Sequence, residues 1–227
     1  MAGSGSEEVK ILGGWPSPFV MRPRIALNIK SVKYDFLQET FGTKSELLLQ
    51  SNPVYKKIPV MIHGDKPICE SMIIVQYIDD VWASSGHPII PSDPYDASTA
   101  RFWATYIDDK FFQSLMAIAK SKDAEERKAA IEQAVAEFGV LEEAYQKTSK
   151  GKDFFGGDKI GYIDITFGCY LGWIRVTEKM NGITLFDETK VPGLTKWADK
   201  FCADEAVKSV MPETDALMKL AKPPPSN

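Results

Sequence analysis

The stretch Trp15-Pro16-Ser17-Pro18-Phe19-Val20 joins a short apolar run, Val9 to Leu12, to a longer amphipathic run, Met21 to Val32. Ser17 followed by Pro18 is typical of a helix N-cap with proline at the first helical position. The stretch therefore predicts a turn from a strand into a helix. The first backbone N–H groups of that helix would point at whatever binds there, which makes the turn a natural anion site with Ser17 as its reactive centre.

The helix after this turn has a clear apolar period and one awkward residue. Met21, Ile25 and Ile29 recur at every fourth position, as on one face of a helix. Pro23 lacks a backbone N–H and would cost about 3 kcal/mol or more in a regular helix interior. We therefore expect either an irregular first turn or a regular helix that starts near Arg22.

The remainder of the first half alternates strands and helices. We expect, in order, a strand at 34–36, a short helix after the capping-box pattern Thr43-x-x-Glu46, a hairpin with strands at 60–62 and 67–69, and a helix capped by Ser71. Together with the first strand and helix, these elements give the order β-α-β-α-β-β-α.

A proline-rich break near residues 84–94 divides the chain. The predicted organisation is an α/β domain at 1–84, a linker at 85–94 and an all-helical domain at 95–227. In the second domain we expect helices at 95–120, 124–148, 161–180, 194–202 and 214–222. The third of these is apolar on most sides, which indicates a central position in the helical domain.

Charge and hydropathy argue against two classes of partner. The 27 basic and 31 acidic residues leave a net charge of −4 and a pI of about 5.4, which disfavours nucleic acid. The start of the chain, residues 1–8, lacks the basic and apolar regions of a signal peptide. The longest apolar stretch, 160–176, is interrupted by Asp164 and Arg175, so we expect no membrane partner.

The thiols and imidazoles show no metal-binding or redox pattern. Cys69, Cys169 and Cys202 lie far apart and form no C-x-x-C pair, so we expect buried thiols in a reducing intracellular compartment. His63 follows the first strand of the hairpin and His87 lies in the break between domains. Neither has the spacing of a metal ligand, and we expect both at the surface and no metal site.

A set of polar residues in the first domain would suit one small ligand: Ser17, Lys44, Lys57, Ile58, Glu70 and Ser71. That ligand is a zwitterionic peptide that carries a thiol. Lysine ammonium groups can meet its carboxylate. A residue before a proline is held extended, so its backbone can pair with an extended ligand like an added strand.

The other three positions of the set supply the remaining chemistry. Glu70 can meet an ammonium group, and Ser71 with the N–H groups of the next helix can meet the adjacent carboxylate. Ser17 can donate its O–H to a thiolate. Donation favours the charged sulfur and lowers a thiol pKa from roughly 8.5 toward neutrality.

Each of these residues also has a plainer interpretation. Ser17 alone is equally consistent with a helix cap that has no chemical role. Isolated lysines such as Lys44 and Lys57 are usually solvated charges, and Glu70-Ser71 can be capping residues only. The order and spacing of the residues, more than any single one, favour a binding site.

The motifs together resemble plant tau-class glutathione transferases over nearly the whole chain. The similarity is carried by Trp15-Pro16-Ser17-Pro18-Phe19, Arg22-x-Arg24-Ile25-Ala26-Leu27, Lys44-Ser45-x-x-Leu48-Leu49, Asn52-Pro53-x-x-Lys56-Lys57-Ile58-Pro59-Val60, Glu70-Ser71-x-x-Ile74-x-x-Tyr77-Ile78-Asp79, Ala100-Arg101-Phe102-Trp103 and Phe155-Gly156-Gly157-Asp158-x-Ile160-Gly161-Tyr162-x-Asp164. One departure concerns the central helix. The wider superfamily caps it with Ser/Thr-x-x-Asp, whereas this chain has Gly161-Tyr162-Ile163-Asp164.

The resemblance implies a thioredoxin-like α/β domain followed by an all-helical domain, and a cytosolic homodimer active in plant detoxification and stress response. It implies glutathione as co-substrate, with no prosthetic group. The glutathione contacts would be Lys44, Lys57, Ile58, Glu70 and Ser71. Pro59 would be cis, and Ser17 would stabilise the thiolate.

An apolar electrophile would be the second substrate. The resemblance implies that it sits between the domains against Trp15, Phe19, Tyr106, Phe111, Trp173 and Phe201. The expected activity is conjugation of the glutathione thiolate to that electrophile, with reduction of organic hydroperoxides as a side activity.

Two other functions compete with conjugation. A glutaredoxin-type redox enzyme needs a cysteine that forms a mixed disulfide, but position 17 is serine, and Cys69 is the only thiol close in sequence to a proposed contact. A carrier of apolar metabolites, or a regulatory protein partner that retains glutathione binding, would use the same pocket. The retention of Ser17, Lys57 and Glu70-Ser71 favours the enzyme over a degraded carrier.

Overall fold

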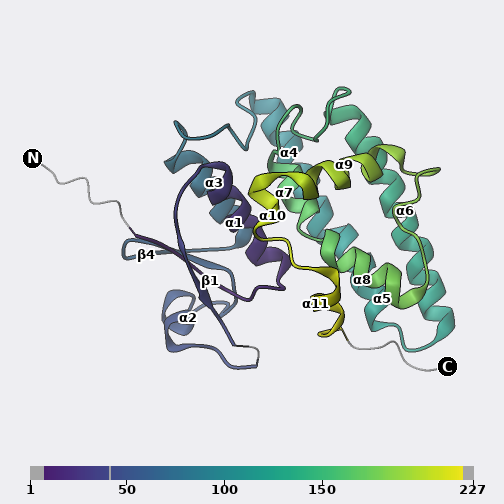
Figure 1. Ribbon diagram of the computed structural model, residues 1–227, viewed down its shortest axis with the longest axis horizontal. Coiled ribbons are helices and arrows are strands. Elements are labelled where there is room, and N and C mark those ends of the chain that lie inside the picture. The colour runs from purple at the N-terminus through teal and green to yellow at the C-terminus, as the bar shows by residue number, and fades with distance from the viewer. Residues whose placement is uncertain (1–7, 41, 222–227) are drawn as a thin grey trace, which may run out of the picture. The chain divides into compact units, whose positions relative to one another are not determined.

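The structure of the protein is a computed structural model that describes residues 8–40 and 42–221 (Figure 1). The chain forms two compact units, Met1–Pro88 and Ile89–Asn227. Most of the segment considered above for a signal peptide, and the last residue of the helix expected at 214–222, lie outside the described residues. Among the described residues, no helix combines the length and apolar character that a membrane crossing requires.

A four-stranded sheet with the order β2-β1-β3-β4 forms the centre of the first unit. Its strands are β1 (Val9–Gly13), β2 (Asp35–Gln38), β3 (Val60–His63) and β4 (Lys66–Cys69). β1 pairs in parallel with β2, and the pairs β1–β3 and β3–β4 are antiparallel. Ile11 and Leu12 of β1 are fully buried, as expected for an apolar strand with a neighbour on each side.

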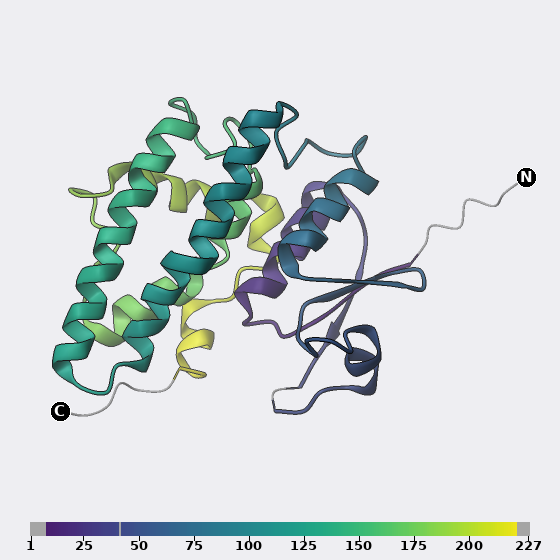
Figure 2. The ribbon, with the colours of Figure 1, turned by 180° about the vertical axis from the view of Figure 1, so that it is seen from behind.

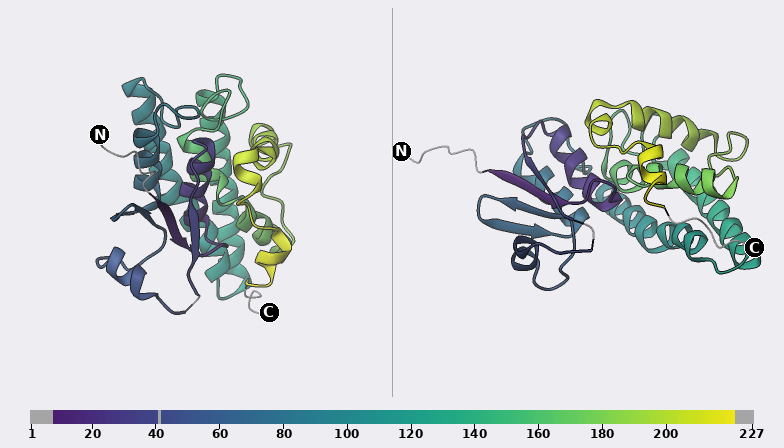
Figure 3. Two further views of the ribbon diagram at one scale, coloured as in Figure 1. Left: turned by 60° about the vertical axis from the view of Figure 1, so that its left-hand side comes forward. Right: turned by 60° about the horizontal axis from the view of Figure 1, so that its bottom comes forward.

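Helices cover both faces of this sheet (Figures 2 and 3). α1 (Pro18–Ile29) and α3 (Ser71–Val81) pack against each other on one face. On the other face, Leu48 of α2 (Glu46–Ser51) packs with Leu12 and Val60. The order β-α-β-α-β-β-α predicted from the sequence is confirmed, and the fold is thioredoxin-like.

α1 begins directly at the predicted turn. Ser17 is its N-cap, and the Ser17 Oγ accepts a hydrogen bond from the backbone N–H of Val20 at 3.4 Å. The helix continues through Pro23 to Ile29, so the expectation that the regular helix starts near Arg22 is wrong. Pro23 is buried. The packing of its ring outweighs the cost of the backbone hydrogen bond that proline, without an N–H, cannot donate.

Two helix N-caps lie one or two residues away from the positions that the sequence predicted. α2 is capped by Ser45 rather than Thr43, because the Ser45 Oγ accepts from the backbone N–H of Leu48 at 3.0 Å. Ser71 is the first residue of α3, and Glu70 occupies the N-cap position with a left-handed φ of 69°. The Ser71 hydroxyl is consequently not used as a cap.

Two buried cations, Arg22 in α1 and Lys30 at its C-cap, reach α3 and the segment after it. Arg22 and Lys30 are both 0% exposed. Arg22 Nη1 donates to the Ser71 Oγ at 3.2 Å. Lys30 Nζ lies 2.7 Å from an Asp79 carboxylate oxygen and donates to the His87 carbonyl at 2.9 Å. The α1–α3 pair is therefore fixed by polar contacts near both of its ends.

The named elements of the second unit, over its described residues 89–221, are all helices. They are α4 (Pro94–Tyr106), the π-helical turn η1 (Ile107–Phe111), α5 (Phe112–Lys120), α6 (Ala124–Thr148), α7 (Tyr162–Gly168), α8 (Leu171–Asn181), α9 (Pro192–Ala203), α10 (Glu205–Lys208) and α11 (Thr214–Met218). The helix expected at 95–120 is thus interrupted by one π turn, and the helix expected at 161–180 divides at Cys169 and Tyr170. Apolar periodicity does not reveal such local breaks, because helical residues continue on both sides of each break.

The start of α7 depends on Asp164, which is fully buried. One carboxylate oxygen accepts from the N–H groups of Gly156 and Gly161, at 2.9 and 2.8 Å. The other accepts from the N–H of Phe155 at 2.8 Å and from the indole N–H of Trp197 at 2.7 Å. The capping pattern therefore works with glycine at its first position, because the aspartate supplies the acceptors.

Candidate functional site

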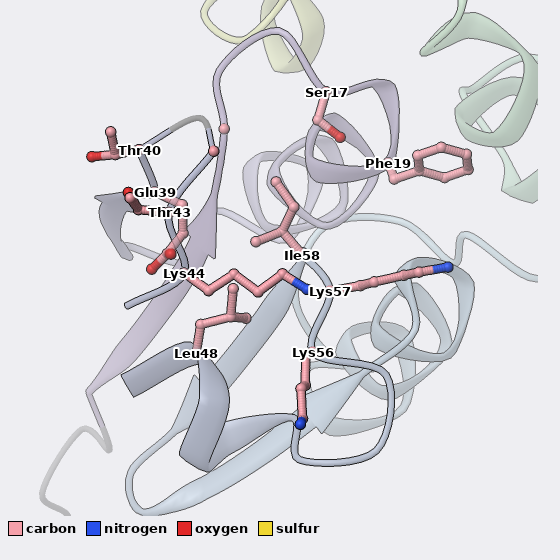
Figure 4. A pocket seen from close by; sticks show the side chains of 12 residues that line it. Ser17, Phe19, Glu39, Thr40, Thr43, Lys44, Leu48, Lys56, Lys57 and Ile58 are labelled. Carbon is pink, nitrogen blue, oxygen red and sulfur yellow. The ribbon is translucent and has the colours of Figure 1, made fainter. Parts of the chain in front are cut away.

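A pocket of about 410 Å³ opens in the first unit beside the predicted reactive serine (Figure 4). Its wall is formed by the turn after β1, the segment between β2 and α2, and the segment before β3. The lining residues are Gly14, Ser17, Phe19, Glu39, Thr40, Gly42, Thr43, Lys44, Leu48, Lys56, Lys57 and Ile58. Four of the six predicted catalytic and glutathione contacts, Ser17, Lys44, Lys57 and Ile58, share this pocket.

Ser17 lies on the pocket wall at the N-terminus of α1. Its oxygen accepts from the Val20 N–H, and no acceptor among the described residues takes its O–H. The hydroxyl can therefore donate to a ligand while it caps the helix. The partial positive charge of the helix N-terminus adds to this donor, and the combination favours a negatively charged ligand atom.

Two lysines bring positive charge to the same pocket. Figure 4 shows the Lys44 side chain extending across it and the Lys57 side chain directed toward the side where Phe19 lies. Both side chains belong to exposed residues. The cations are thus accessible to a carboxylate from solvent, while the carboxylate of Glu39 also lines the pocket.

Hydrogen bonds from neighbouring side chains hold the backbone near both lysines. Glu39 accepts from the Ser45 backbone N–H at 3.1 Å and from the Ser45 hydroxyl at 2.6 Å. Asn52 Nδ2 donates to the Lys57 carbonyl at 2.9 Å. These contacts explain how the backbone that carries two exposed lysines keeps a defined position. The sequence alone assigned no role in the site to Glu39 or Asn52.

Ile58 precedes a cis peptide bond to Pro59, as predicted. Pro59 is followed at once by β3, in which Val60 pairs with Cys69 of β4. Glu70, the residue after Cys69, is therefore held next to the Ile58-Pro59 segment. The strand register brings the last two predicted contacts, Glu70 and Ser71, beside the others, although neither lines the pocket itself.

Glu70 and Ser71 differ in exposure. Glu70 is exposed in its left-handed conformation, so its carboxylate is open to solvent. Ser71 is 8% exposed, and its oxygen accepts from buried Arg22. Sequence reasoning did not assign Arg22 to the site. The sequence does not distinguish it from Arg24, the other arginine of the same helix.

The predicted contacts for an apolar substrate fall into two groups. Trp15, Phe19, Tyr106 and Trp173 are each partly exposed, and Phe19 lines the pocket described above. Phe111 and Phe201 are 0% exposed and belong to the core of the second unit. For these two residues the prediction is corrected, because a fully buried ring has no surface to offer a ligand.

The aromatic packing of the second unit explains that burial. Phe111 makes edge-to-face contacts with Phe138 and Phe167, at ring distances of 5.2 and 5.1 Å. Phe201 packs on Trp197 and fills the space beside Gly168, where a Cβ atom would come within 2.3 Å of its ring. Both rings hold helices together.

The hydroxyl of Tyr106 is already hydrogen-bonded within the protein. Its O–H donates to a carboxylate oxygen of Glu137, which is buried and also accepts from Gln133 at 2.7 Å. Burial, followed by the hydrogen bond to Glu137 and its charge, raises the pKa of the Tyr106 phenol. The ring therefore stays neutral and offers a ligand its apolar edge and face.

Cys69 does not have the properties of a nucleophile. Its thiol is partly buried, with Sγ 3.6 Å from the Ser51 carbonyl. Burial, with a smaller contribution from the charge of Glu70, raises the pKa of the thiol. The described residues also contain no group of three or more His, Cys, Asp or Glu side chains that could hold a metal ion.

Replacing Cys69 by serine should leave the rate of glutathione conjugation within about twofold of the wild type, because the neutral thiol is not placed to react. The measurement is kcat/KM for an aromatic halide with saturating glutathione. Cys202→Ser, which changes a partly buried thiol in the second unit, is the matched control. A near-total loss for Cys69→Ser alone would restore the thiol-redox hypothesis.

Comparisons with known proteins agree with this geometry. Residues 7–80 match the N-terminal domain of glutathione S-transferases, and residues 93–188 match the C-terminal domain. The chain is 60% identical to glutathione S-transferase U17 of Arabidopsis thaliana over 217 residues, which cover 96% of each chain. It is 56% identical to U18 of the same plant, again over 96% of each chain.

Solved structures show the same relationship. A tau-class glutathione S-transferase from mango superposes with a TM-score of 0.92 at 59% identity, over 96% of this chain and 98% of that one. A rice glutathione transferase in complex with glutathione superposes with a TM-score of 0.87 at 30% identity, over 96% of both chains. Because these alignments cover nearly the whole of both chains at sequence identities of up to 60%, the chain belongs to the tau class of the glutathione S-transferases.

Proposed function

We propose that the protein conjugates the thiolate of glutathione to apolar electrophiles. The observation that carries the proposal is the position of Ser17, a free O–H donor at a helix N-terminus, on the same pocket as Lys44 and Lys57. A thiolate and a carboxylate of one peptide are the anions that such a pocket would hold. Glutathione is then a co-substrate, and we propose no prosthetic group.

Binding of glutathione would use opposite charges at its two ends. Lys44 and Lys57 would hold the glycine carboxylate, and the Ile58 backbone would pair with the cysteinyl part as an added strand. The γ-glutamyl end carries an ammonium group and a carboxylate. Glu70 would hold the first, and Ser71 with the N-terminus of α3 would hold the second.

Ser17 would then control the reactive sulfur. Its O–H donates to the sulfur and stabilises the thiolate, which lowers the thiol pKa and raises the fraction of nucleophile at neutral pH. The sulfur lone pair attacks an electrophilic carbon of the second substrate and forms the C–S bond. The leaving group departs with its bonding electrons, and proximity supplies much of the rate.

For the second substrate we propose an apolar electrophile held against Trp15, Phe19, Tyr106 and Trp173. All four have partly exposed aromatic rings, which suits an apolar or aromatic molecule. Reduction of organic hydroperoxides by the same thiolate would be a side activity. We propose a cytosolic location, which the family implies, and a regulatory protein partner only for the alternative in which the protein is a non-catalytic carrier.

We also propose a homodimer. The four most exposed large apolar side chains of the described residues are Val54 and Tyr55 in the first unit and Tyr95 and Phe102 in the second. Exposed aromatic residues of this kind are enriched at protein interfaces. Light scattering with size-exclusion chromatography would give about twice the chain mass of 25.3 kDa if the proposal is right.

The direct test measures conjugation of glutathione to 1-chloro-2,4-dinitrobenzene by absorbance, together with glutathione affinity by calorimetry. We expect both binding and turnover. Binding without turnover of this halide or of a hydroperoxide would favour the carrier of apolar metabolites. Absence of glutathione binding would contradict the proposed site altogether.

Replacing Lys57 by alanine should weaken glutathione binding about tenfold, the effect of losing one partly solvated charge contact of about 1.4 kcal/mol. Because Lys57 is exposed, its loss should leave the melting temperature unchanged within about 2 °C. Lys66→Ala, an exposed lysine of β4 that does not line the pocket, is the control. Unchanged affinity in Lys57→Ala would show that the carboxylate binds elsewhere.

A further inference from the structure

Glu137 is a carboxylate on the buried face of α6. It is 9% exposed, and Ala134, one turn earlier on the same helix, is fully buried. Its two oxygens accept one hydrogen bond each, one from the Tyr106 hydroxyl and one from Gln133 Nε2 at 2.7 Å. In the part of the chain that the structure describes, no lysine or arginine forms an ion pair with it. A buried carboxylate without a paired cation depends on its hydrogen-bond donors, so Glu137 holds the Tyr106 hydroxyl firmly.

Tyr106 is bonded within the protein through its hydroxyl but remains partly exposed. It is the last residue of α4, and the π turn η1 begins at the next residue. Single π turns inside helices are frequent at functional sites. The Tyr106 ring also packs edge to face on Trp103, with ring centres 5.4 Å apart. Two contacts therefore fix the orientation of a residue that is proposed to contact the second substrate.

The hydrogen bond to Glu137 decides what the Tyr106 hydroxyl can offer a ligand. A tyrosine hydroxyl has one hydrogen, and Glu137 accepts it. The raised pKa of the phenol keeps that hydrogen on Tyr106 at neutral pH. Toward a substrate, Tyr106 therefore offers its ring and the lone pairs of its oxygen, but no donor. A substrate oxygen that gains negative charge during the reaction receives no hydrogen bond from it.

Electrophiles differ in where that negative charge goes. When a thiolate opens an epoxide, the C–S bond forms, the C–O bond breaks and its electrons go to the oxygen, which then takes a proton from a donor or from water. When a thiolate displaces chloride from a benzylic carbon, the electrons of the C–Cl bond leave with the chloride, which needs no proton. A donor aimed at the developing oxyanion therefore speeds the first reaction much more than the second.

We propose that Glu137 is a positioning residue that sets the electrophile class: by holding the Tyr106 hydroxyl, it makes the enzyme favour halides over epoxides. The proposal rests on the proposed function, because it takes Tyr106 as a contact of the second substrate. Glu137 does not touch the substrate itself. It acts through Tyr106, so its effect on substrate choice should disappear when the Tyr106 hydroxyl is removed. Its other partner, Gln133, is tested separately.

The test is a double-mutant cycle read by a selectivity ratio, which is kcat/KM for styrene oxide divided by kcat/KM for benzyl chloride. Both electrophiles carry one phenyl ring, and both rates are followed as loss of free thiol at saturating glutathione and neutral pH. Glu137→Leu removes the acceptor at similar volume and frees the hydroxyl, and Tyr106→Phe removes the hydroxyl but keeps the ring. Gln133→Leu is the matched control, because it removes a partner of Glu137 and leaves the acceptor of Tyr106 in place.

We expect Glu137→Leu to raise the selectivity ratio about tenfold, the effect of one hydrogen bond to a developing charge. In the Tyr106→Phe background the same change should move the ratio by less than about twofold. Tyr106→Phe alone should move both kcat/KM values together, and Gln133→Leu should leave the ratio within about twofold of the wild type. An unchanged ratio in Glu137→Leu, or an equal rise without the hydroxyl, would overturn the role of Glu137.

Two further variants complete the test. If Glu137→Leu does not fold, which thermal unfolding would reveal, the adaptable side chain of Glu137→Met takes its place and should give the same rise. Glu137→Gln keeps an oxygen that accepts from Tyr106, so its ratio should stay within about threefold of the wild type, and a full tenfold rise would contradict the proposal. A wild type that does not conjugate 1-chloro-2,4-dinitrobenzene would refute the proposed function, whereas an active wild type with no change of ratio in Glu137→Leu would refute only the role of Glu137.

Discussion

Ser17→Ala should lower kcat for conjugation by about 10- to 100-fold at pH 6.5. The physical reason is the loss of one hydrogen bond to a charged sulfur, worth about 1.5–3 kcal/mol. The thiol pKa of bound glutathione should rise toward the free value of roughly 8.5. The deficit should therefore shrink as the pH approaches 9, where the thiolate forms without assistance. The measurement is kcat at saturating glutathione from pH 6 to 9.

The controls must separate chemistry from helix capping, because Ser17 performs both tasks. Loss of the cap alone costs about 1 kcal/mol of stability. Ser17→Asp keeps a good cap but has no O–H at neutral pH, so it should fold like the wild type and lose activity. Ser17→Thr keeps both functions and should retain most of the activity. A Ser17→Asp variant with wild-type kcat would show that the hydroxyl does not act on sulfur.

The pocket that holds Ser17 and Ile58 was largely predictable, because these residues are close in sequence to the elements that carry them. Ser17 follows β1 and starts α1, and the Ser-Pro pair marks that junction directly. Ile58 stands before a proline that leads into β3. Patterns of this kind depend on local backbone geometry, which neighbouring residues determine.

The contacts of Arg22 and Asn52 could not be predicted because they depend on the folded backbone. Arg22 contacts Ser71, which is 49 positions away. Nothing in a single sequence shows that an arginine of an apolar helix is turned inward to meet a hydroxyl. Asn52 holds the Lys57 carbonyl across a turn that becomes visible only when the backbone is in place.

Burial of aromatic residues was the least predictable feature. Phe111 and Tyr106 both lie on the long helical stretch expected at 95–120, yet Phe111 is fully buried and Tyr106 is partly exposed. The π turn at Ile107–Phe111 comes between Tyr106 and the rest of that stretch and changes the angular position of the residues after it. The substrate contact of Phe111 was inferred from the family resemblance, and nothing in one sequence shows that its ring, at the end of the π turn, is buried in the core.

Asp164→Asn should destabilise the helical unit by about 3–5 kcal/mol, the largest stability effect that we expect. Burial raises the pKa of Asp164 to about 6, against the opposing effect of its four hydrogen bonds, so the carboxyl is mostly ionised at pH 7.5. In that state both oxygens accept from two N–H groups each. The amide of asparagine would turn an NH₂ group toward two of these donors, and each buried donor without an acceptor costs about 1–3 kcal/mol.

The measurement is chemical unfolding at pH 7.5, with circular dichroism to follow helix content. Asp153→Asn is the matched control: Asp153 lies in the same segment and also contacts α9, through Lys200 at 3.0 Å, but both side chains are more than half exposed. Its loss should change stability by less than about 0.5 kcal/mol. If Asp164→Asn lowered the free energy of unfolding no more than Asp153→Asn, the carboxylate would be dispensable. The start of α7 would then be held by the packing of Phe155 on Trp197, whose ring centres lie 5.5 Å apart.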